Sequence, residues 1–171
     1  MFVTTFRFSP ITDKAQLVAA LAHIHGACHK LCRQSVGLYL PVAGNIGIFS
    51  HSDDEYTRLT ELQREMTDPS DQVYGKYFRL HMPVHISADH GIPQASYTHL
   101  YIRKPDPNKP QVGDLDFFME TAQFATLKIS LKNDSTGIHG ARTLNRPDLD
   151  LIELFDPDVD ALGYVGDKKW Q

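Results

Sequence analysis

One strand-like segment of the chain alternates apolar residues with residues that hold anions or move protons. In residues 97–104, Leu100 and Ile102 alternate with tyrosine, histidine and arginine. Because successive side chains of a strand point to opposite faces, one face of this segment carries Tyr97, His99, Tyr101 and Arg103. Arginine together with tyrosine can hold a carboxylate or a phosphate, and histidine can exchange a proton near neutral pH.

The same alternation places further charged side chains on one face of other segments. In the first half of the chain these residues are Tyr77, Arg79, His81, His85 and Ser87, and in the second half they are Asp114, Asp116 and Glu153. A histidine that faces a carboxylate can act as a general acid and base. We therefore predict His99, Asp114, Asp116 and Glu153 as catalytic residues. The predicted ligand-binding residues are Arg79, Tyr97, Tyr101, Arg103, His81 and His85.

Two other interpretations of these faces stay open. The first is a metal site made of two of His81, His85 and His99 together with one carboxylate. The second is a solvent-exposed face of an ordinary antiparallel sheet, whose cross-strand ion pairs contribute little to stability. The site that we predict holds no metal and no cofactor.

A histidine and cysteine cluster occupies one segment near the N-terminus. His25, Cys28, His29 and Cys32 are spaced at i, i+3, i+4 and i+7, so they share one face of a helix. Imidazole and thiolate are good zinc ligands, but one straight helix cannot place four ligands around a tetrahedral ion. We predict that Cys28 packs in the apolar stripe as a small hydrophobic residue, with the histidines at the edge of that stripe.

Helix signals surround these residues. Thr12 or Asp13 can cap a helix that runs to about Arg33, and Ser52 with Glu55 forms a capping box at the start of a second helix. A third helix is expected to begin after Thr121. We expect the first helix to pack on the outside of the fold.

Strand and turn signals fill the rest of the chain. Strands are expected at residues 45–50, 76–81, 84–88, 97–104, 112–119, 138–144, 149–155 and 161–165. Residues 68–71 contain aspartate, proline and serine, which favour a turn. Residues 105–110 contain three prolines, which predict a linker.

These elements repeat. Both halves are expected to run strand, helix, strand, strand, strand, and Ile46, Ile48, Tyr56 and Leu59 correspond to Leu115, Phe117, Phe124 and Leu127. The predicted fold class is α+β, with two tandem β-α-β-β-β modules that form a mixed or antiparallel sheet around a shared cavity. We divide the chain into an N-terminal helix and short strand (1–43), a first module (44–104), a linker (105–111), and a second module with a tail (112–171).

The tandem modules resemble the vicinal oxygen chelate superfamily, which includes glyoxalases and extradiol dioxygenases. The resemblance rests on residues 45–66 and 112–131, and on the closing Asp156-Pro157 turn, which is similar to the final hairpin of that family. It implies a shared cavity between the modules. In metal-using members, a histidine or carboxylate lies on the first and last strand of each module. Here Asn45 and Gly163 occupy two of the matching places, so the resemblance does not carry over the metal site.

Composition limits the classes of partner. The chain has 171 residues, 42% hydrophobic residues and a net charge of −4, with a pI near 6.1. These values are typical of a globular protein without the basic excess of a nucleic-acid binder. We expect no membrane span or signal peptide, and two cysteines predict a reducing cytoplasm.

The favoured function is binding of a small polar or anionic metabolite in an inter-module cavity, with acid and base chemistry if the protein is an enzyme. One alternative is a protein-protein interaction or structural protein that forms a homo-oligomer. Another is a metal-dependent lyase, isomerase or dioxygenase with an off-pattern histidine and carboxylate site.

Overall fold

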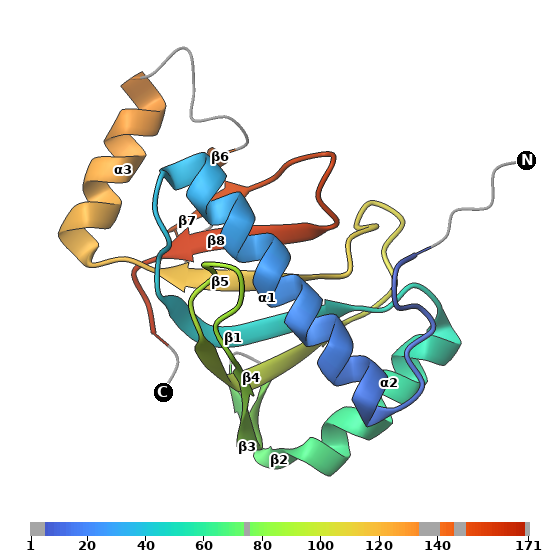
Figure 1. Cartoon of the computed structure of the whole chain (residues 1–171). Coiled ribbons are helices and arrows are strands. Elements are labelled where there is room, and N and C mark those ends of the chain that lie inside the picture. Colours follow the sequence, from blue (N-terminus) through green and yellow to red (C-terminus); the bar gives the residue numbers. More distant parts are fainter. Residues whose placement is uncertain (1–5, 74–75, 134–140, 146–149, 170–171) are drawn as a thin grey trace, which may run out of the picture.

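The protein is built on one mixed β-sheet with helices packed against it, in a computed structural model that describes residues 6–73, 76–133, 141–145 and 150–169. Figure 1 shows the elements in chain order. They are α1 (Lys14–Val36), β1 (Val42–Phe49), α2 (Asp53–Met66), β2 (Thr67–Val73), β3 (Tyr77–Ile86), β4 (Ala95–Arg103), β5 (Gly113–Phe118), α3 (Thr121–Asn133), β6 (Ala141–Asn145), β7 (Asp150–Leu154) and β8 (Ala161–Gly166).

The strand order confirms the predicted duplication. The eight described strands lie in the order β2-β3-β4-β1-β5-β8-β7-β6. Within each half, the first strand pairs in parallel with the last, β1 with β4 and β5 with β8. The halves meet where β1 and β5 pair antiparallel, with Ile46 opposite Leu115. The fold is therefore α+β with two β-α-β-β-β modules, and α1 is an addition to them.

Two predictions about the strands of the first module were wrong, one of a turn and one of a break between two strands. The predicted turn at residues 68–71 belongs to β2, and the predicted strands 76–81 and 84–88 are one strand, β3. The register of β3 against β4 shifts between Arg79 and Val84. Pro83 lies inside this irregularity and has no N–H to donate to a neighbouring strand, so the local sequence suggests a break where the strand continues.

The first helix packs on one face of the sheet, as an addition to the two modules, and its apolar stripe enters the core. Asp13 caps it by accepting a hydrogen bond from the N–H of Gln16, and Gly37 ends it with a φ of 92°. The stripe residues Leu17, Leu21 and Ile24 are fully buried. Figure 1 shows α1 in blue, lying across the sheet. An eight-stranded sheet has a wide apolar face, and α1 buries a large part of it.

The second helix begins as the capping box predicts. The N–H of Glu55 donates to Ser52 Oγ, 3.1 Å away. The carboxylate of Glu55 accepts from the backbone N–H of His51 and of Ile11, both at 2.7 Å. Glu55 therefore ties the segment before α1 to the start of α2.

The two faces of the sheet differ in chemistry. Residues paired across neighbouring strands share a face of the sheet. The apolar face carries Ile46, Leu100, Leu115 and Val165, which pack with α1 in the core. The opposite set contains Asn45, Gly47, Tyr101, Asp114 and Tyr164. The fold thus gathers polar residues of both modules on one face.

Candidate functional site

A polar cluster lies where the two modules join. We call Asn45, Asp114, Asp116, Glu153 and Tyr164 the Asp114 cluster. Asp116 lies opposite Tyr164, which in turn lies opposite Glu153. Asn45 Nδ2 donates to Asp116 Oδ2 at 2.6 Å and so holds one carboxylate of β5 from the neighbouring strand. Residues from β1, β5, β7 and β8 meet here, as the alternation of the strands predicts.

The central carboxyl group of this cluster is buried. Asp114 is 6% exposed, and burial together with the nearby charge of Asp116 raises its pKa to about 7. Arg103, Lys76 and Lys109 act in the opposite direction. Asp114 is therefore poised to gain or lose a proton near neutral pH.

Gly47 makes the space that this carboxyl group occupies. A Cβ atom at residue 47 would lie 2.3 Å from Asp114 Oδ1 and 3.4 Å from Tyr101 Cδ1. The first distance is far below van der Waals contact, so a larger residue would displace the carboxyl group. The aspartate and the tyrosine ring meet over this glycine.

Tyrosines around the cluster remain protonated. Burial raises the pKa of Tyr77 and of Tyr164 well above the ordinary value. The two aspartates add to this at Tyr77, and Asp114 with Glu153 adds to it at Tyr164. Burial also raises the pKa of Tyr101, although Arg103 opposes this. These phenols can donate hydrogen bonds but do not act as bases at neutral pH.

Two cations, Arg103 and Lys76, lie against the aromatic rings beside the cluster. The guanidinium carbon of Arg103 lies 4.9 Å from the ring centroid of Phe49 and 6.0 Å from that of Tyr101. The Nζ of Lys76 lies 5.2 Å from the same Tyr101 ring. The Nε of Arg103 is buried and has no hydrogen-bond partner within the described ranges. Arg103 therefore has an unused donor beside the cluster.

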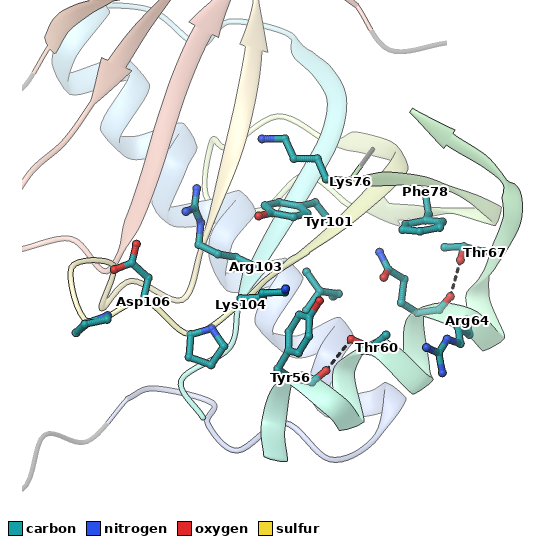
Figure 2. Close-up of a pocket in the computed structure, with 14 residues that line it drawn as sticks. Tyr56, Thr60, Arg64, Thr67, Lys76, Phe78, Tyr101, Arg103, Lys104 and Asp106 are labelled. Carbon is teal, nitrogen blue, oxygen red and sulfur yellow. Dashed lines mark hydrogen bonds between the residues drawn. The ribbon is translucent and has the colours of Figure 1, made fainter. Parts of the chain in front are cut away.

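A pocket of about 800 Å³ opens at this point, and Figure 2 shows its lining. Its charged residues are Arg64, Lys76, Arg103, Lys104 and Asp106. Its aromatic and proline residues are Tyr56, Phe78, Tyr101, Pro105 and Pro107. In Figure 2, Lys76, Tyr101 and Arg103 lie on one side, and Tyr56 and Thr60 of α2 on the other.

The end of β4 and the helix α2 shape this pocket. The described pairing of β3 with β4 begins where Phe78 lies opposite Leu100, so the last residues of β4, up to Arg103, extend past it. Gln63 Nε2 donates to the carbonyl of Leu100 at 2.9 Å, which fixes α2 against β4. The pocket therefore lies between the first module and the start of the linker that follows it, whereas the sequence predicted an inter-module cavity.

The structure brings some predicted site residues together. Asp114, Asp116 and Glu153 share the cluster, and Tyr101 and Arg103 join it to the pocket. His99 is fully buried opposite Asn45, with its Nδ1 2.8 Å from the hydroxyl of Thr98. Their functional roles stay predictions.

Other predicted residues lie elsewhere. The hydroxyl of Tyr97 lies 2.6 Å from Nδ1 of His25, so this side chain meets α1 instead of the cluster. Arg79, His81 and His85 are exposed on β3, and His85 Nδ1 lies 3.0 Å from Ser96 Oγ. The irregularities of β3 interrupt the alternation from which these faces were assigned.

Strand-face alternation did not predict most of the pocket lining. Arg64 lies on a helix, and Lys76 fell on the face of the predicted strand 76–81 opposite to Tyr77, so neither belonged to the predicted polar face. Lys104 follows a strand directly and precedes Pro105, Asp106 and Pro107. Charged loop residues that follow a strand often bind ligands, so the position of Lys104 was the signal in the sequence that could have indicated this pocket.

The histidine and cysteine cluster of α1 is buried. Cys28 packs in the stripe as predicted, with Sγ 3.2 Å from the carbonyl oxygen of Leu162, and burial raises its thiol pKa. The prediction that the histidines lie at the edge was wrong, since His25 and His29 are 2% and 1% exposed. Burial, with a smaller effect of His25, lowers the pKa of His29 to about 4.

The described residues give little support for a metal site. They contain no group of three or more histidine, cysteine, aspartate or glutamate residues placed to hold a metal ion. Gly163 lies opposite Leu154 on the apolar face, so the cluster residue of β8 is its neighbour Tyr164. That the protein carries no metal remains a prediction.

Comparisons with known proteins give structural likeness only. No protein-family model and no curated protein matches the chain. Its fold is similar to that of a structural genomics protein, EC4020, with a TM-score of 0.61 and 13% identity over 99% of this chain and 94% of that chain. Two complexes of variants of Streptomyces coelicolor methylmalonyl-CoA epimerase with 2-nitronate-propionyl-CoA match at TM-scores of 0.33 and 0.31. They are 15% and 13% identical over 74% of this chain and 98% of theirs. None of the described helices is both long and apolar enough to cross a bilayer.

Proposed function

We propose that this protein binds a small anionic metabolite in the pocket between α2 and the end of β4. The observation that carries this proposal is the charge of the lining, where Arg64, Lys76, Arg103 and Lys104 face a single acidic residue, Asp106. Such an excess of cations in a concave site favours an anion.

Arg103 is the proposed anchor. A guanidinium group can form two parallel hydrogen bonds with a carboxylate, phosphate or sulfonate, and the buried Nε of Arg103 is without a partner in the described part of the chain. An anion that reached this atom would supply the missing acceptor. Lys76 and Lys104 add positive charge at the same place.

The rest of the lining favours a ligand with an apolar or planar part. Tyr56, Phe78 and Tyr101 bring aromatic surface to the pocket. A volume of about 800 Å³ lies in the range that accommodates small metabolites. The ligand class is therefore an organic anion and not an inorganic ion alone.

Titration with two anions, sulfate and benzenesulfonate, tests this proposal. Calorimetry should show binding of both, with benzenesulfonate the tighter because its ring meets the aromatic lining. Arg103→Gln should weaken binding roughly ten- to a hundredfold, the effect of losing a hydrogen bond to a charged group.

The matched control is Lys30→Gln, which removes an exposed cation on α1 away from the pocket lining. It should leave affinity unchanged. Equal weakening by both variants would mean that the anions respond to the net charge of the protein, and the pocket assignment would then be wrong.

We also propose kinship with the vicinal oxygen chelate superfamily, supported by the two β-α-β-β-β modules and their parallel β1–β4 and β5–β8 pairs. A sequence profile built from collected homologues of this chain would test it. A significant match of both modules to another superfamily would contradict the kinship.

A further inference from the structure

The pocket and the buried carboxyl group of Asp114 share the same cations. Arg103 and Lys76 line the pocket, and both stabilise the ionised form of Asp114. Tyr101 connects the two places physically, because it lines the pocket and its ring edge approaches Gly47 beside Asp114 Oδ1. A charge placed in the pocket therefore meets the same two cations, and the same tyrosine ring, that neighbour the buried carboxyl group of Asp114.

Charged and titratable groups approach Asp114 from every neighbouring element. They are Asp116 on β5, Tyr101 and Arg103 on β4, Tyr77 on β3 with the preceding Lys76, Tyr164 on β8, Glu153 on β7 opposite Tyr164, Lys109 before β5, and Cys28 on α1. Tyr77, Tyr164 and Cys28 remain protonated because burial raises the pKa of each. Among the charges that shift the Asp114 pKa, the carboxylate of Asp116 therefore opposes the three cations, and Glu153 lies further off, beyond Tyr164.

We propose that an anion binds in this pocket together with a proton that Asp114 takes up from solvent. This inference rests on the proposed function and adds the regulation of the same site. An anion on Arg103 and Lys76 offsets the positive charge that stabilises the Asp114 carboxylate, and its own charge repels that carboxylate. Protonation leaves Asp114 as a neutral carboxyl group that no longer competes for the cations.

The coupling between anion binding and protonation of Asp114 acts near neutral pH. The pKa of Asp114 is about 7 in the free protein, and an anion in the pocket raises it. Below this value Asp114 is already protonated, so binding takes up no proton. Between this value and the raised pKa of the bound state, binding takes up a proton, and affinity decreases as pH rises, by at most tenfold per pH unit.

Calorimetry in buffers of different ionisation enthalpy measures the protons taken up. Sulfate and benzenesulfonate suit this experiment because neither changes its own charge near neutral pH. We expect proton uptake on binding to increase toward one per site as the pH rises through the Asp114 pKa. Asp114→Asn, which resembles the protonated carboxyl group in shape and charge, should abolish the uptake and make affinity independent of pH in that range.

Asp106→Asn is the matched control. It removes the acidic residue of the pocket lining itself, so it should strengthen binding but retain the uptake of a proton. Binding of either anion without proton uptake, or with uptake that persists in Asp114→Asn, would overturn the inference while the proposed function stood. Absence of binding at every pH would refute both.

A ligand-free measurement gives an independent test. Carbonyl-carbon NMR can follow the titration of Asp114, and Arg103→Gln should raise its pKa because a neighbouring cation is lost. Lys30→Gln should leave that pKa in place. An Asp114 pKa that is unaffected by Arg103→Gln would contradict the coupling, whatever the anions do.

Discussion

At the scale of single residues, Gly47 and Asp114 depend on each other. They lie opposite one another on β1 and β5, and the carboxyl group occupies the space where a side chain at residue 47 would stand. A buried carboxyl group needs this kind of close fit, because displacement would move it away from the cations that stabilise its charge.

Gly47→Ala should destabilise the protein by about 1–3 kcal/mol, since the added methyl group would lie 2.3 Å from Asp114 Oδ1. Urea denaturation measures the change. Gly26→Ala, within α1, is the control, because the added Cβ would contact only Ile92 Cδ1, at an ordinary 3.8 Å. It should stabilise by roughly 0.4–1 kcal/mol. Equal effects of the two variants would show that the site at residue 47 can relax.

At the scale of elements, α1 contains an acid-sensitive pair of histidines. The rings of His25 and His29 lie 4.4 Å apart, and His29 packs against Phe117 with its centroid 5.1 Å away. Neither nitrogen of His29 has a hydrogen-bond partner in the described part of the chain. A protonated His29 would be a buried charge without compensation, so α1 packs well only when this ring is neutral.

The His29 pKa of about 4 lies below the ordinary 6.5, so stability is fully present above pH 6.5 and is lost as pH falls toward 4. The full loss is about 3 kcal/mol. His29→Phe should keep the packing with Phe117 and reduce this acid loss, measured by urea unfolding at neutral and acidic pH. His81→Gln, at an exposed position, should leave it unchanged. An acid loss in His29→Phe equal to that of the unsubstituted protein would exclude His29 as its source.

Glu55 links two elements, since its carboxylate accepts hydrogen bonds from two backbone N–H groups and from the hydroxyl of Ser9. Glu55→Gln replaces one acceptor oxygen with a donor, so an N–H of Ile11 or His51 loses its partner. The expected cost is about 1–3 kcal/mol. Glu61→Gln, on the exposed side of α2 beside Arg58, should cost less than about 0.5 kcal/mol. Thermal unfolding compares the two, and similar costs would contradict the anchoring role of Glu55.

At the scale of the whole molecule, the two modules meet edge to edge through β1 and β5, and α1 covers much of the apolar face of the common sheet. Carboxylates come mostly from the second module, and the pocket cations come from the first. The duplication therefore produces two chemically different halves, one with most of the pocket cations and one with most of the buried carboxylates.

The purified protein, prepared without a histidine tag, should contain no stoichiometric transition metal. A catalytic zinc or iron needs about three converging protein ligands, and His81 and His85 are exposed on β3 while His99 is buried on β4. Elemental analysis measures this directly. One equivalent of zinc, iron, nickel or manganese per chain, lost in His99→Ala, would overturn the prediction.

Local signals in the sequence were sufficient for much of the fold. Asp13, Ser52 and Glu55 mark helix starts because a capping side chain satisfies backbone groups only two or three residues away. The repeat was also visible, and the corresponding residues Ile46 and Leu115 are direct partners in the sheet. Alternation within β5 and β7 was enough to place Asp114, Asp116 and Glu153 on one face, because those strands are regular.

Only the tertiary structure decided the rest. The register shift in β3, the contact of Tyr97 with His25, and the burial of His29 depend on residues far apart in the chain, which no local pattern relates. The pocket depends on how far β4 extends past β3 and on how Gln63 fixes α2 to Leu100. The proton affinity of Asp114 likewise depends on burial and on cations from other strands, since a sequence lists charges but does not give the distances between them.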